Sequence, residues 1–267
     1  MIDIHNHLLP GIDDGAADMA MALAMLEQMV AQGVSQVFCT PHLSFRRLGD
    51  VDQVIAYVKQ CDQGFQQLQA EAVRTGLAIT LHTGFELALD ADFFEILEQL
   101  PDPQALGLAR SSYFLIEITS SYLLNIQTLE NYLYRFAAAG LTPIMAHPEW
   151  TLQTVSDKFI EVIIRWVRQG RLMLQLNASS IIELGRWLDM PFSHGYRRRC
   201  LTRRFLKENL VYFIASDAHD TCKRPPDLLQ ARNYLNKRYE PRLTQALFHD
   251  HAIQLASGQT VISQKQL

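Results

Sequence analysis

The sequence predicts an α/β fold, in the form of a seven-stranded barrel of alternating strands and helices. Short runs of β-type residues alternate with longer amphipathic stretches, and Gly76, Gly140 and Gly170 stand where a helix would end before the next strand. Such alternation implies parallel strands joined by right-handed crossovers. The 267 residues contain no fixed-period repeat, low-complexity tract or long linker, which favours a single domain over 1–267. An open doubly wound sheet is the structural alternative.

Seven short segments have the residue types of β-strands, and their number favours the barrel over the open sheet. No glycine-rich nucleotide-binding motif follows any of these segments, so the sequence lacks the main signature of an open dinucleotide-binding sheet. The expected strands are 2–4, 35–39, 77–81, 113–118, 141–145, 171–176 and 211–215.

The stretches between these segments have helical periodicity. In the first, Met19, Ala22 and Leu26 recur on one face, while Asp18 can cap the start and Gly33 can end the helix. The expected helices are 18–32, 53–74, 92–99, 125–139, 156–169, 196–208, 226–236 and 240–256.

The composition argues against several classes of protein. Twenty-four Lys+Arg against 28 Asp+Glu give a net charge of −4, so neither nucleic-acid binding nor anionic-membrane binding is favoured. Charged residues interrupt every apolar stretch before the ~20 residues that a membrane span needs, and no secretory signal is evident, so we expect a cytoplasmic protein. The four cysteines form no C-x-x-C pair and no Cys-x5-Arg phosphate loop, which argues against redox, zinc-knuckle and cysteine-phosphatase chemistry.

Residues with metal-binding side chains gather at the expected carboxyl ends of the strands, where β/α barrels build their active sites. Six of the nine histidines are among them. In chain order these ends carry His5, His7, Asp13, Asp14, His42, His82, Glu86, Glu117, His147, Glu149, Asn177, Asp217 and His219.

The joint pattern predicts a centre with several metal ions. Converging imidazoles and carboxylates resist burial unless a cation neutralises them, and mixed His and carboxylate ligands suit Mn, Fe or Zn. In His5-x-His7 and Asp217-x-His219, side chains two residues apart on an extended segment point to one side and can grip one ion. A lone histidine at a strand end is more often structural, so the prediction depends on the whole set.

Seven motifs that occur in order resemble a known family. They are DIHNHLLPGIDDG at 3–15, TPH at 40–42, GFE at 84–86, Glu117, AHPE at 146–149, QLNAS at 175–179 and ASDAH at 215–219. On these motifs the chain resembles the polymerase-and-histidinol-phosphatase (PHP) superfamily. Within it, the chain is similar to the bacterial metal-dependent protein-tyrosine phosphatases of capsule and exopolysaccharide loci, and the PGIDDG extension is the most specific element.

This resemblance implies a distorted seven-stranded TIM-like barrel of the PHP fold that holds three divalent ions. Manganese is the expected metal, and iron, zinc or magnesium would also fit. The three ions would be held by His5, His7, Glu86 and Asp217; by Glu86, Glu117 and His147; and by Asp14, His42 and His219. Asp13 could replace Asp14, and His82 is expected to be structural.

The implied reaction is hydrolysis of a phosphomonoester by a metal-bridging hydroxide that attacks phosphorus in line. Asp14 or His42 could help to protonate the leaving phenolate. Because no protein nucleophile is needed, this mechanism agrees with the missing Cys-x5-Arg loop.

Arginine should help to bind phosphate, since its planar fork matches two phosphate oxygens. The family has an arginine seven residues after the aspartate of its DxH motif, and Arg224 occupies that position here. A second family arginine follows the HPE motif, but here that residue is Trp150. Arg46 or Arg47 could substitute for it, or Trp150 could stack on the tyrosine ring.

A run of basic residues in the expected helix 196–208 allows two interpretations. It can be a solvated outer face, or it can dock an acidic, tyrosine-rich tail of a partner kinase. The run consists of Arg197, Arg198, Arg199, Arg203, Arg204 and Lys207.

The function predicted from these features is that of a metal-dependent protein-tyrosine phosphatase. Its expected substrate is a bacterial tyrosine kinase that controls capsular or exopolysaccharide synthesis. The phosphotyrosine is expected in the tail of this kinase. A small-molecule phosphatase such as histidinol-phosphate phosphatase is the main alternative. A phosphodiesterase or nuclease and a non-catalytic regulatory module are further alternatives. No nucleic-acid partner and no membrane insertion are expected.

Overall fold

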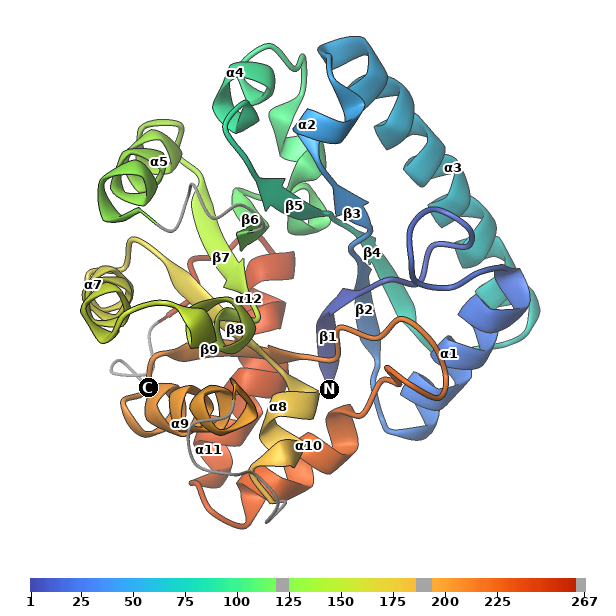
Figure 1. Ribbon diagram of the computed structural model, residues 1–267. Coiled ribbons are helices and arrows are strands. Elements are labelled where there is room, and N and C mark those ends of the chain that lie inside the picture. Colours follow the sequence, from blue (N-terminus) through green and yellow to red (C-terminus); the bar gives the residue numbers. More distant parts are fainter. Residues whose placement is uncertain (119–124, 186–193, 263–267) are drawn as a thin grey trace.

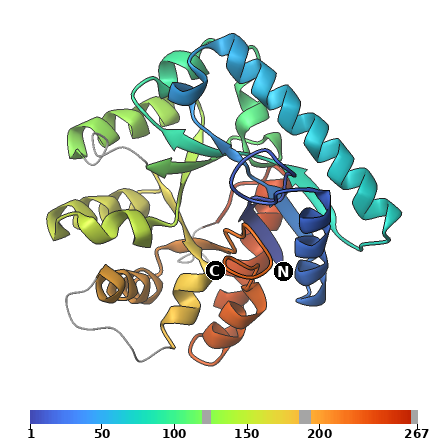
Figure 2. The ribbon, with the colours of Figure 1, turned by 45° about the vertical axis from the view of Figure 1, so that its right-hand side comes forward.

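The computed structural model describes residues 1–118, 125–185 and 194–262. Its parallel strands lie at the centre, and helices surround them (Figure 1; Figure 2 shows the same arrangement after a 45° turn). The strands are β1 (Ile2–Asn6), β2 (Gln36–Cys39), β3 (His42–Leu43), β4 (Thr80–Thr83), β5 (Glu86–Leu89), β6 (Tyr113–Ile118), β7 (Thr142–Ala146), β8 (Met173–Asn177) and β9 (Val211–Ala215).

The strands form two hydrogen-bonded sheets. One has the order β1-β2-β4 and the other the order β3-β5-β6-β7-β8-β9, and every ladder is parallel. The α/β class and the parallel strands are therefore as predicted. Over the described residues, the ladders differ from a single ring of seven strands.

The difference arises because the chain breaks at two of the predicted strand ends and continues into the other sheet. Pro41, which has no N–H to donate, separates β2 from β3. Gly84 separates β4 from β5 at a point where a Cβ atom would lie 2.7 Å from a side-chain carbon of Leu108. Both short continuations pair with each other, so that His42 lies opposite Glu86. The break thus places two predicted ligands side by side.

The two sheets meet again where β1 lies beside the end of β9. Asp3 is buried, and its carboxylate accepts hydrogen bonds from the backbone N–H and the hydroxyl of Ser216 at 2.9 and 2.6 Å. The backbone N–H of Asp217 donates to the carbonyl of His5 at 2.8 Å, and that of His7 donates to Ala218 at 2.9 Å. These bonds fix the first and last metal-binding motifs against each other.

The predicted helices form within a few residues of their expected bounds, although 240–256 is divided by a π-helical turn. Three short helices, α2, α6 and α8, follow strands where no helix was predicted. No described helix is both long enough and apolar enough to span a membrane. The helices are α1 (Met19–Ala31), α2 (Phe45–Leu48), α3 (Val51–Arg74), α4 (Phe93–Leu97), α5 (Ile126–Ala138), α6 (Pro148–Thr151), α7 (Asp157–Arg168), α8 (Ala178–Glu183), α9 (His194–Lys207), α10 (Leu228–Asn236), α11 (Pro241–Gln245) and α12 (His251–Ala256). The 3₁₀ turns are η1 (Pro103–Leu106), η2 (Leu108–Arg110) and η4 (Leu152–Thr154), and the π turn is η5 (Ala246–Asp250).

Buried aromatic side chains pack helices α2, α4 and α5 against one another. Phe93 and Phe94 of α4 are buried against Phe45 and Phe136, with ring centroids 5.2 and 4.9 Å apart for the pairs Phe45–Phe93 and Phe94–Phe136. Fully buried aromatic side chains of this size contribute strongly to a core, and truncating one costs about 3–5 kcal/mol. Phe136 of α5 also contacts Phe114 of β6, with ring centroids 6.5 Å apart, so this packing connects the helices to the strand next to β5, which carries Glu86.

His251 of α12 gives the fold a pH-dependent contact far from the metal centre. The side chain is buried, with Nδ1 2.7 Å from the carbonyl oxygen of Tyr212, and burial lowers its pKa although this bond and Asp250 oppose the shift. Below pH 6.5, His251 therefore binds a proton more readily in the unfolded chain than in the folded chain. The free energy of unfolding consequently decreases as the pH falls through that range. We expect the free energy of unfolding, measured with urea, to decrease less steeply with falling pH in His251→Gln than in the wild type, by up to about 1.4 kcal/mol per pH unit. Equal slopes for both proteins between pH 6.5 and 5 would contradict this assignment.

Candidate metal centre

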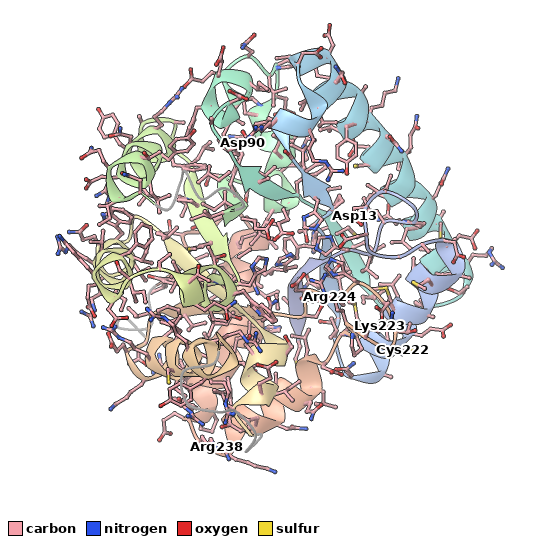
Figure 3. The ribbon with its side chains drawn as sticks, viewed as in Figure 1. Asp13, Asp90, Cys222, Lys223, Arg224 and Arg238 are labelled. Atoms are coloured by element: carbon pink, nitrogen blue, oxygen red, sulfur yellow. The ribbon has the colours of Figure 1, made fainter. Side chains whose placement is uncertain are left out.

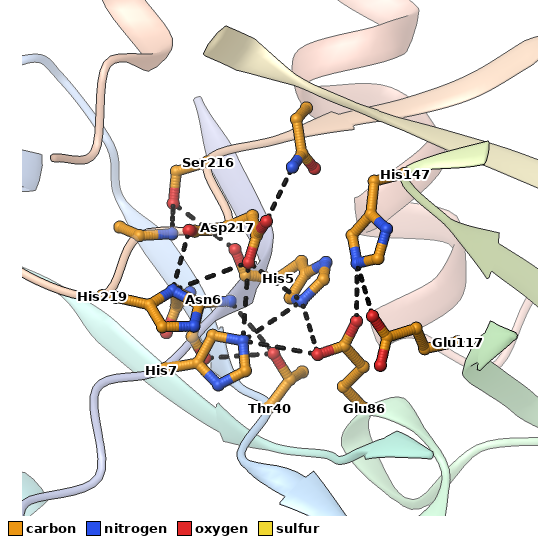
Figure 4. A network of polar contacts seen from close by, with 12 residues as sticks. His5, Asn6, His7, Thr40, Glu86, Glu117, His147, Ser216, Asp217 and His219 are labelled. Atoms are coloured by element: carbon orange, nitrogen blue, oxygen red, sulfur yellow. Dashed lines mark hydrogen bonds and ion pairs between the residues drawn. The ribbon is translucent and has the colours of Figure 1, made fainter. Parts of the chain in front are cut away.

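The structure brings all nine predicted metal-binding residues together at the carboxyl ends of the strands. Most of them appear in Figure 4 as one network of polar contacts that connects β1, β5, β6, β7 and the segment after β9. Their donor atoms form four overlapping groups, each within 4.8 Å. The groups are His5, His7 and Asp217; His5, Glu86 and His147; His42, Glu86 and Glu117; and His7, Asp14, His42 and His219.

The first cluster joins two histidines and two carboxylates. The Nε2 atoms of His5 and His7 lie 3.3 and 3.4 Å from Oε2 of Glu86, 3.6 and 3.5 Å from Oδ1 of Asp217, and 3.4 Å from each other. Four donors at about 2.1 Å from one ion in tetrahedral geometry would stand about 3.4 Å apart. The spacing of this cluster therefore fits one divalent ion.

The protonation of the two histidines explains why a cation is needed there. Nδ1 of His5 lies 2.9 Å from the Gln175 side-chain oxygen, and Nδ1 of His7 lies 2.7 Å from Asp13. Both partners accept hydrogen bonds, so Nδ1 carries the proton in the neutral form of each ring, and Nε2 can then present a lone pair to a metal ion. Four potential ligand atoms thus converge in a buried place, where Nδ1 of His42 also lies 2.9 Å from Oε2 of Glu86. Burial lowers the pKa of His7, but its hydrogen bonds to Asp13, Asp217 and Glu86 together outweigh burial and raise that pKa well above its usual value, so the surrounding carboxylates favour positive charge at this point. A metal ion satisfies this arrangement, and a core of neutral hydrogen bonds does not.

A second cluster surrounds His147. Its Nε2 lies 2.9 Å from Oε1 of Glu86 and 3.7 Å from Oε1 of Glu117. Burial lowers the pKa of His147, but the bond to Glu86 and the charges of Glu86, Asp217 and Glu117 together outweigh burial and raise the pKa to about 9. Burial and the neighbouring charge of Glu86 raise the pKa of Glu117. Two carboxylates and an imidazole in this arrangement can share a second cation through Glu86.

The third cluster lies at the more exposed edge. Oδ1 of Asp14 is 3.4 Å from Nε2 of both His42 and His219. Nδ1 of His219 donates to the carbonyl of Asp217 at 3.0 Å, which leaves its buried Nε2 without a hydrogen-bond partner and directed at Asp14. Burial, and then the nearby His7, lower the pKa of His219 to about 4, so its lone pair is available near neutral pH.

The structure separates the roles of the two adjacent aspartates. Asp13 accepts hydrogen bonds from the ring of His7 and from the backbone of Gly15 and His42. Burial raises the pKa of Asp13, but the hydrogen bond and charge of His7 and the two backbone N–H bonds together outweigh burial and lower the pKa to about 2. Asp14 has 64% of its side chain exposed and is the aspartate that faces His42 and His219. The geometry therefore favours Asp14 as the ligand and Asp13 as the residue that orients His7.

Three residues that orient the ligands were not among the predicted ligands, although Glu149 and Asn177 were expected at the strand ends and Gln175 lies in the QLNAS motif. The side-chain nitrogen of Gln175 donates to Asn177 at 3.0 Å, and that of Asn177 donates to Asp217 at 2.6 Å. Buried Glu149 accepts the backbone N–H of Asn177 at 3.0 Å. The QLN and HPE motifs were the available signal for these residues, because both contain polar side chains within apolar, buried strand ends.

Backbone geometry also positions the ligands. His147 and Asp217 have positive φ angles of 32° and 53°, which residues other than glycine rarely adopt. Such strained positions cluster at functional sites. Gly15 has another steric role, since a Cβ atom there would lie 2.1 Å from the carbonyl oxygen of His7. The loop that carries Asp13 and Asp14 can therefore pack against His7 only with glycine at this position.

Gly15→Ala should damage the metal centre more than the fold. The added methyl group must push the loop away from His7, which separates Asp14 from His42, so we expect at least a tenfold loss of metal affinity by titration calorimetry. Gly33→Ala is the matched control, because Gly33 has a φ of +81° but no atom within 4 Å of its Cβ position. That change should cost about 1–2 kcal/mol of stability and leave metal affinity unchanged. Equal metal affinity in the two variants would contradict the packing role of Gly15.

A cavity of about 730 Å³ opens beside the clusters. Arg224 lies on its wall, 47% exposed, with one guanidinium nitrogen 2.9 Å from Oδ2 of Asp217. Lys223 also faces this cavity, although the sequence analysis did not single it out. Figure 3 marks both residues on the loop after β9. Asp220 closes that loop by accepting backbone N–H bonds from residues 222–224.

A second cavity of about 920 Å³ adjoins the clusters on the side of His42, Asp14 and Glu117. Arg47 lines it, whereas the backbone of Arg46 is bonded to Asp90. Of the two arginines considered near His42, Arg47 is the one on this cavity. His82 lies apart from the ligands: its Nε2 is 2.8 Å from the side chain of Gln36 and its ring stacks on Phe38, which agrees with its expected structural role.

At least three residues of the predicted basic run in α9 form ion pairs with described acidic residues outside that helix. Arg197 pairs with Asp157, Arg198 with Glu183, and Arg204 with both Glu161 and Glu208. These pairs favour the interpretation of the run as an outer face that packs against neighbouring elements.

The chain is similar to proteins of known type over nearly its full length. The family model described as capsular polysaccharide synthesis, CpsB/CapC, matches residues 1–257. Tyrosine-protein phosphatase YwqE of Bacillus subtilis is 27% identical over 264 residues, which cover 99% of this chain and 94% of that protein. Tyrosine-protein phosphatase CpsB of Streptococcus agalactiae serotype III is 28% identical over 257 residues, covering 94% and 96%.

Solved structures show the same fold. A chain from the crystal structures of YwqE of Bacillus subtilis and CpsB of Streptococcus pneumoniae, described as unique metal-dependent tyrosine phosphatases, superposes with a TM-score of 0.76. It is 24% identical, and the match covers 99% of this chain and 97% of that chain. The family that the ordered motifs predicted is thereby confirmed. The chain belongs to the CpsB/CapC family of capsular polysaccharide synthesis.

Proposed function

We propose that this protein is a metal-dependent phosphatase that hydrolyses phosphotyrosine in proteins. One observation carries the proposal: one side-chain nitrogen or oxygen atom from each of His5, His7, Glu86 and Asp217 converges in a buried place, with nitrogen-to-oxygen distances of 3.3–3.6 Å, next to a cavity that Arg224 lines. The names of the relatives, tyrosine-protein phosphatases, support a phosphotyrosine substrate over the small-molecule alternative.

The proposed cofactor is a set of three divalent ions, with manganese as the expected metal. The first ion would be held by His5, His7, Glu86 and Asp217, the second by Glu86, Glu117 and His147, and the third by Asp14, His42 and His219. Bound divalent ions would supply positive charge beside a phosphate group and favour the ionisation of water at neutral pH.

The chain's own residues bind and orient the phosphate ester. Arg224 has exposed guanidinium N–H groups in addition to the one that bonds Asp217, so it can donate to phosphate oxygens from the cavity wall. Lys223 adds a second positive charge on the same loop. His42 and Asp14 lie at the exposed edge, where a proton can be delivered to the departing phenolate oxygen.

The proposed biological substrate is a phosphotyrosine tail of a bacterial tyrosine kinase that controls capsule or exopolysaccharide synthesis. The family description supports a connection with capsular polysaccharide. The proposed cellular location is the cytoplasm. Residues 1–267 are proposed to form one catalytic domain.

Metal-reconstituted hydrolysis of a phosphotyrosine peptide, measured beside hydrolysis of histidinol phosphate, tests this proposal. We expect manganese to support turnover of the peptide with a kcat/KM at least tenfold above that of histidinol phosphate, and a chelator to abolish both rates. Higher kcat/KM for histidinol phosphate would favour the small-molecule alternative. Full turnover in excess chelator would reject metal dependence.

A further inference from the structure

A tryptophan forms part of the cavity wall beside the metal-binding residues. Trp150 lies in the short helix α6, where its backbone N–H donates to the carbonyl of His147 at 2.9 Å. Its side chain is 41% exposed, and it lines the cavity together with Ile182 and Glu183 of α8. Large aromatic side chains usually bury more of their surface than this, so its exposure towards the cavity calls for a physical reason.

The indole ring is held from one side by an arginine. The guanidinium carbon of Arg198 in α9 lies 3.8 Å from the ring centroid of Trp150. The same guanidinium donates to one carboxylate oxygen of Glu183 at 2.6 and 3.1 Å, and only 13% of the Arg198 side chain is exposed. The arginine is therefore fixed by a largely buried ion pair and cannot leave the ring without breaking it. This arrangement fixes the orientation of the indole before any ligand arrives.

We propose that Trp150 is the residue that binds the aromatic ring of the phosphate ester and so selects aryl phosphates over alkyl phosphates. Because Arg198 covers one face of the indole, the part exposed to the cavity remains available for an aromatic group. Arg224 on the wall of the same cavity provides the contact for phosphate. Phosphotyrosine carries both groups on one side chain. Arg198 and Glu183 are positioning residues in this assignment, since they act through the indole. The inference rests on the proposed phosphatase function.

Competitive inhibition by phosphonates tests the assignment without a difference in leaving group. The probes are phenylphosphonate, cyclohexylphosphonate and inorganic phosphate, with the manganese-loaded enzyme and p-nitrophenyl phosphate as substrate. Stacking of aromatic rings adds roughly two- to tenfold in affinity beyond the buried area. We therefore expect the wild type to bind phenylphosphonate about two- to tenfold more tightly than cyclohexylphosphonate.

Two variants of Trp150 distinguish aromatic stacking from the burial of apolar surface. Trp150→Phe should keep the preference for phenylphosphonate, whereas Trp150→Leu should reduce the ratio of the two inhibition constants to about one. Inorganic phosphate has no ring, so its inhibition constant should stay within about twofold in both variants. An unchanged ratio in Trp150→Leu would overturn the inference. An equal weakening of all three inhibitors would also overturn it, because that result indicates a structural role.

Fluorescence provides a readout that does not depend on turnover. Trp150 is one of three tryptophans in the chain. Phenylphosphonate should quench the emission of the wild type in a saturable manner, and this change should be absent from Trp150→Phe. Saturable quenching of the same size in Trp150→Phe would show that the phenyl ring of the inhibitor does not bind at Trp150.

The role of Arg198 is tested by a variant that avoids leaving a charge unpaired. Arg198→Met together with Glu183→Gln removes the ion pair and the cation over the indole but retains similar side-chain volumes. We expect the preference for phenylphosphonate to fall at least twofold with phosphate inhibition unchanged, and an unchanged preference would remove Arg198 from the assignment. If the wild type bound neither phosphonate and hydrolysed no phosphotyrosine, the proposed function itself would fail, which differs from every result above.

Discussion

Glu86→Gln is expected to lower kcat/KM on a phosphotyrosine peptide by more than about a hundredfold. Oε1 of Glu86 lies 2.9 Å from His147, and Oε2 lies 3.3 and 3.4 Å from His5 and His7 and 2.9 Å from His42. Glutamine replaces one of these oxygens by an N–H donor and removes the charge that two proposed ions share. Loss of even an orienting partner of a metal ligand commonly costs 10- to 100-fold. The loss at a shared ligand should be larger.

The measurement combines steady-state kinetics at saturating manganese with the metal content of the purified protein. Glu130→Gln is the matched control, because Glu130 pairs with Arg171 on a partly exposed surface away from the clusters. It should keep both activity and metal content, since such surface pairs contribute at most about 1 kcal/mol. Activity of Glu86→Gln within tenfold of the wild type would reject the shared role of this carboxylate.

Arg224→Ala is expected to lower kcat/KM by about 10- to 150-fold. The change removes a charge-assisted hydrogen bond to phosphate, which contributes about 1.5–3 kcal/mol. Arg224→Lys should recover only part of the loss, because an ammonium group cannot form the planar two-point contact. Metal content should stay near that of the wild type in both variants, since Asp217 keeps its hydrogen bond from Asn177 at 2.6 Å.

The kinetic measurement uses a phosphotyrosine peptide over a full range of concentrations. Arg110→Ala, which removes an exposed pair with Asp102, is a control for the loss of any arginine. A change within twofold for Arg224→Ala would show that this guanidinium does not hold the phosphate.

The sequence allowed the class of fold and most element positions to be predicted, because long amphipathic helices and buried strands have clear periodicity. The two breaks between the sheets were not predictable in the same way. β3 contains only His42 and Leu43, and such a short segment has no readable alternation. Pro41 and Gly84 are local signals, but the steric reason for Gly84 is Leu108, a residue far along the chain. Only the assembled fold reveals that contact.

That the proposed ligands lie close together was predictable for a different reason: in parallel α/β folds the carboxyl ends of strands meet at one edge. The choice between Asp13 and Asp14 could not be made from the sequence, since it depends on which carboxylate the loop turns towards His7. The environment of Trp150 was equally hidden, because Arg198 reaches it from α9 through an ion pair with Glu183 in α8. Neighbours of this kind are set by tertiary packing.

The most direct test of the metal centre is a crystal structure of the manganese-equilibrated protein with anomalous diffraction data. We expect three anomalous peaks, each about 2.0–2.5 Å from its donor atoms: one among His5, His7, Glu86 and Asp217, one among Glu86, Glu117 and His147, and one among Asp14, His42 and His219. Absence of anomalous density between these side chains at saturating manganese would contradict the proposed metal centre.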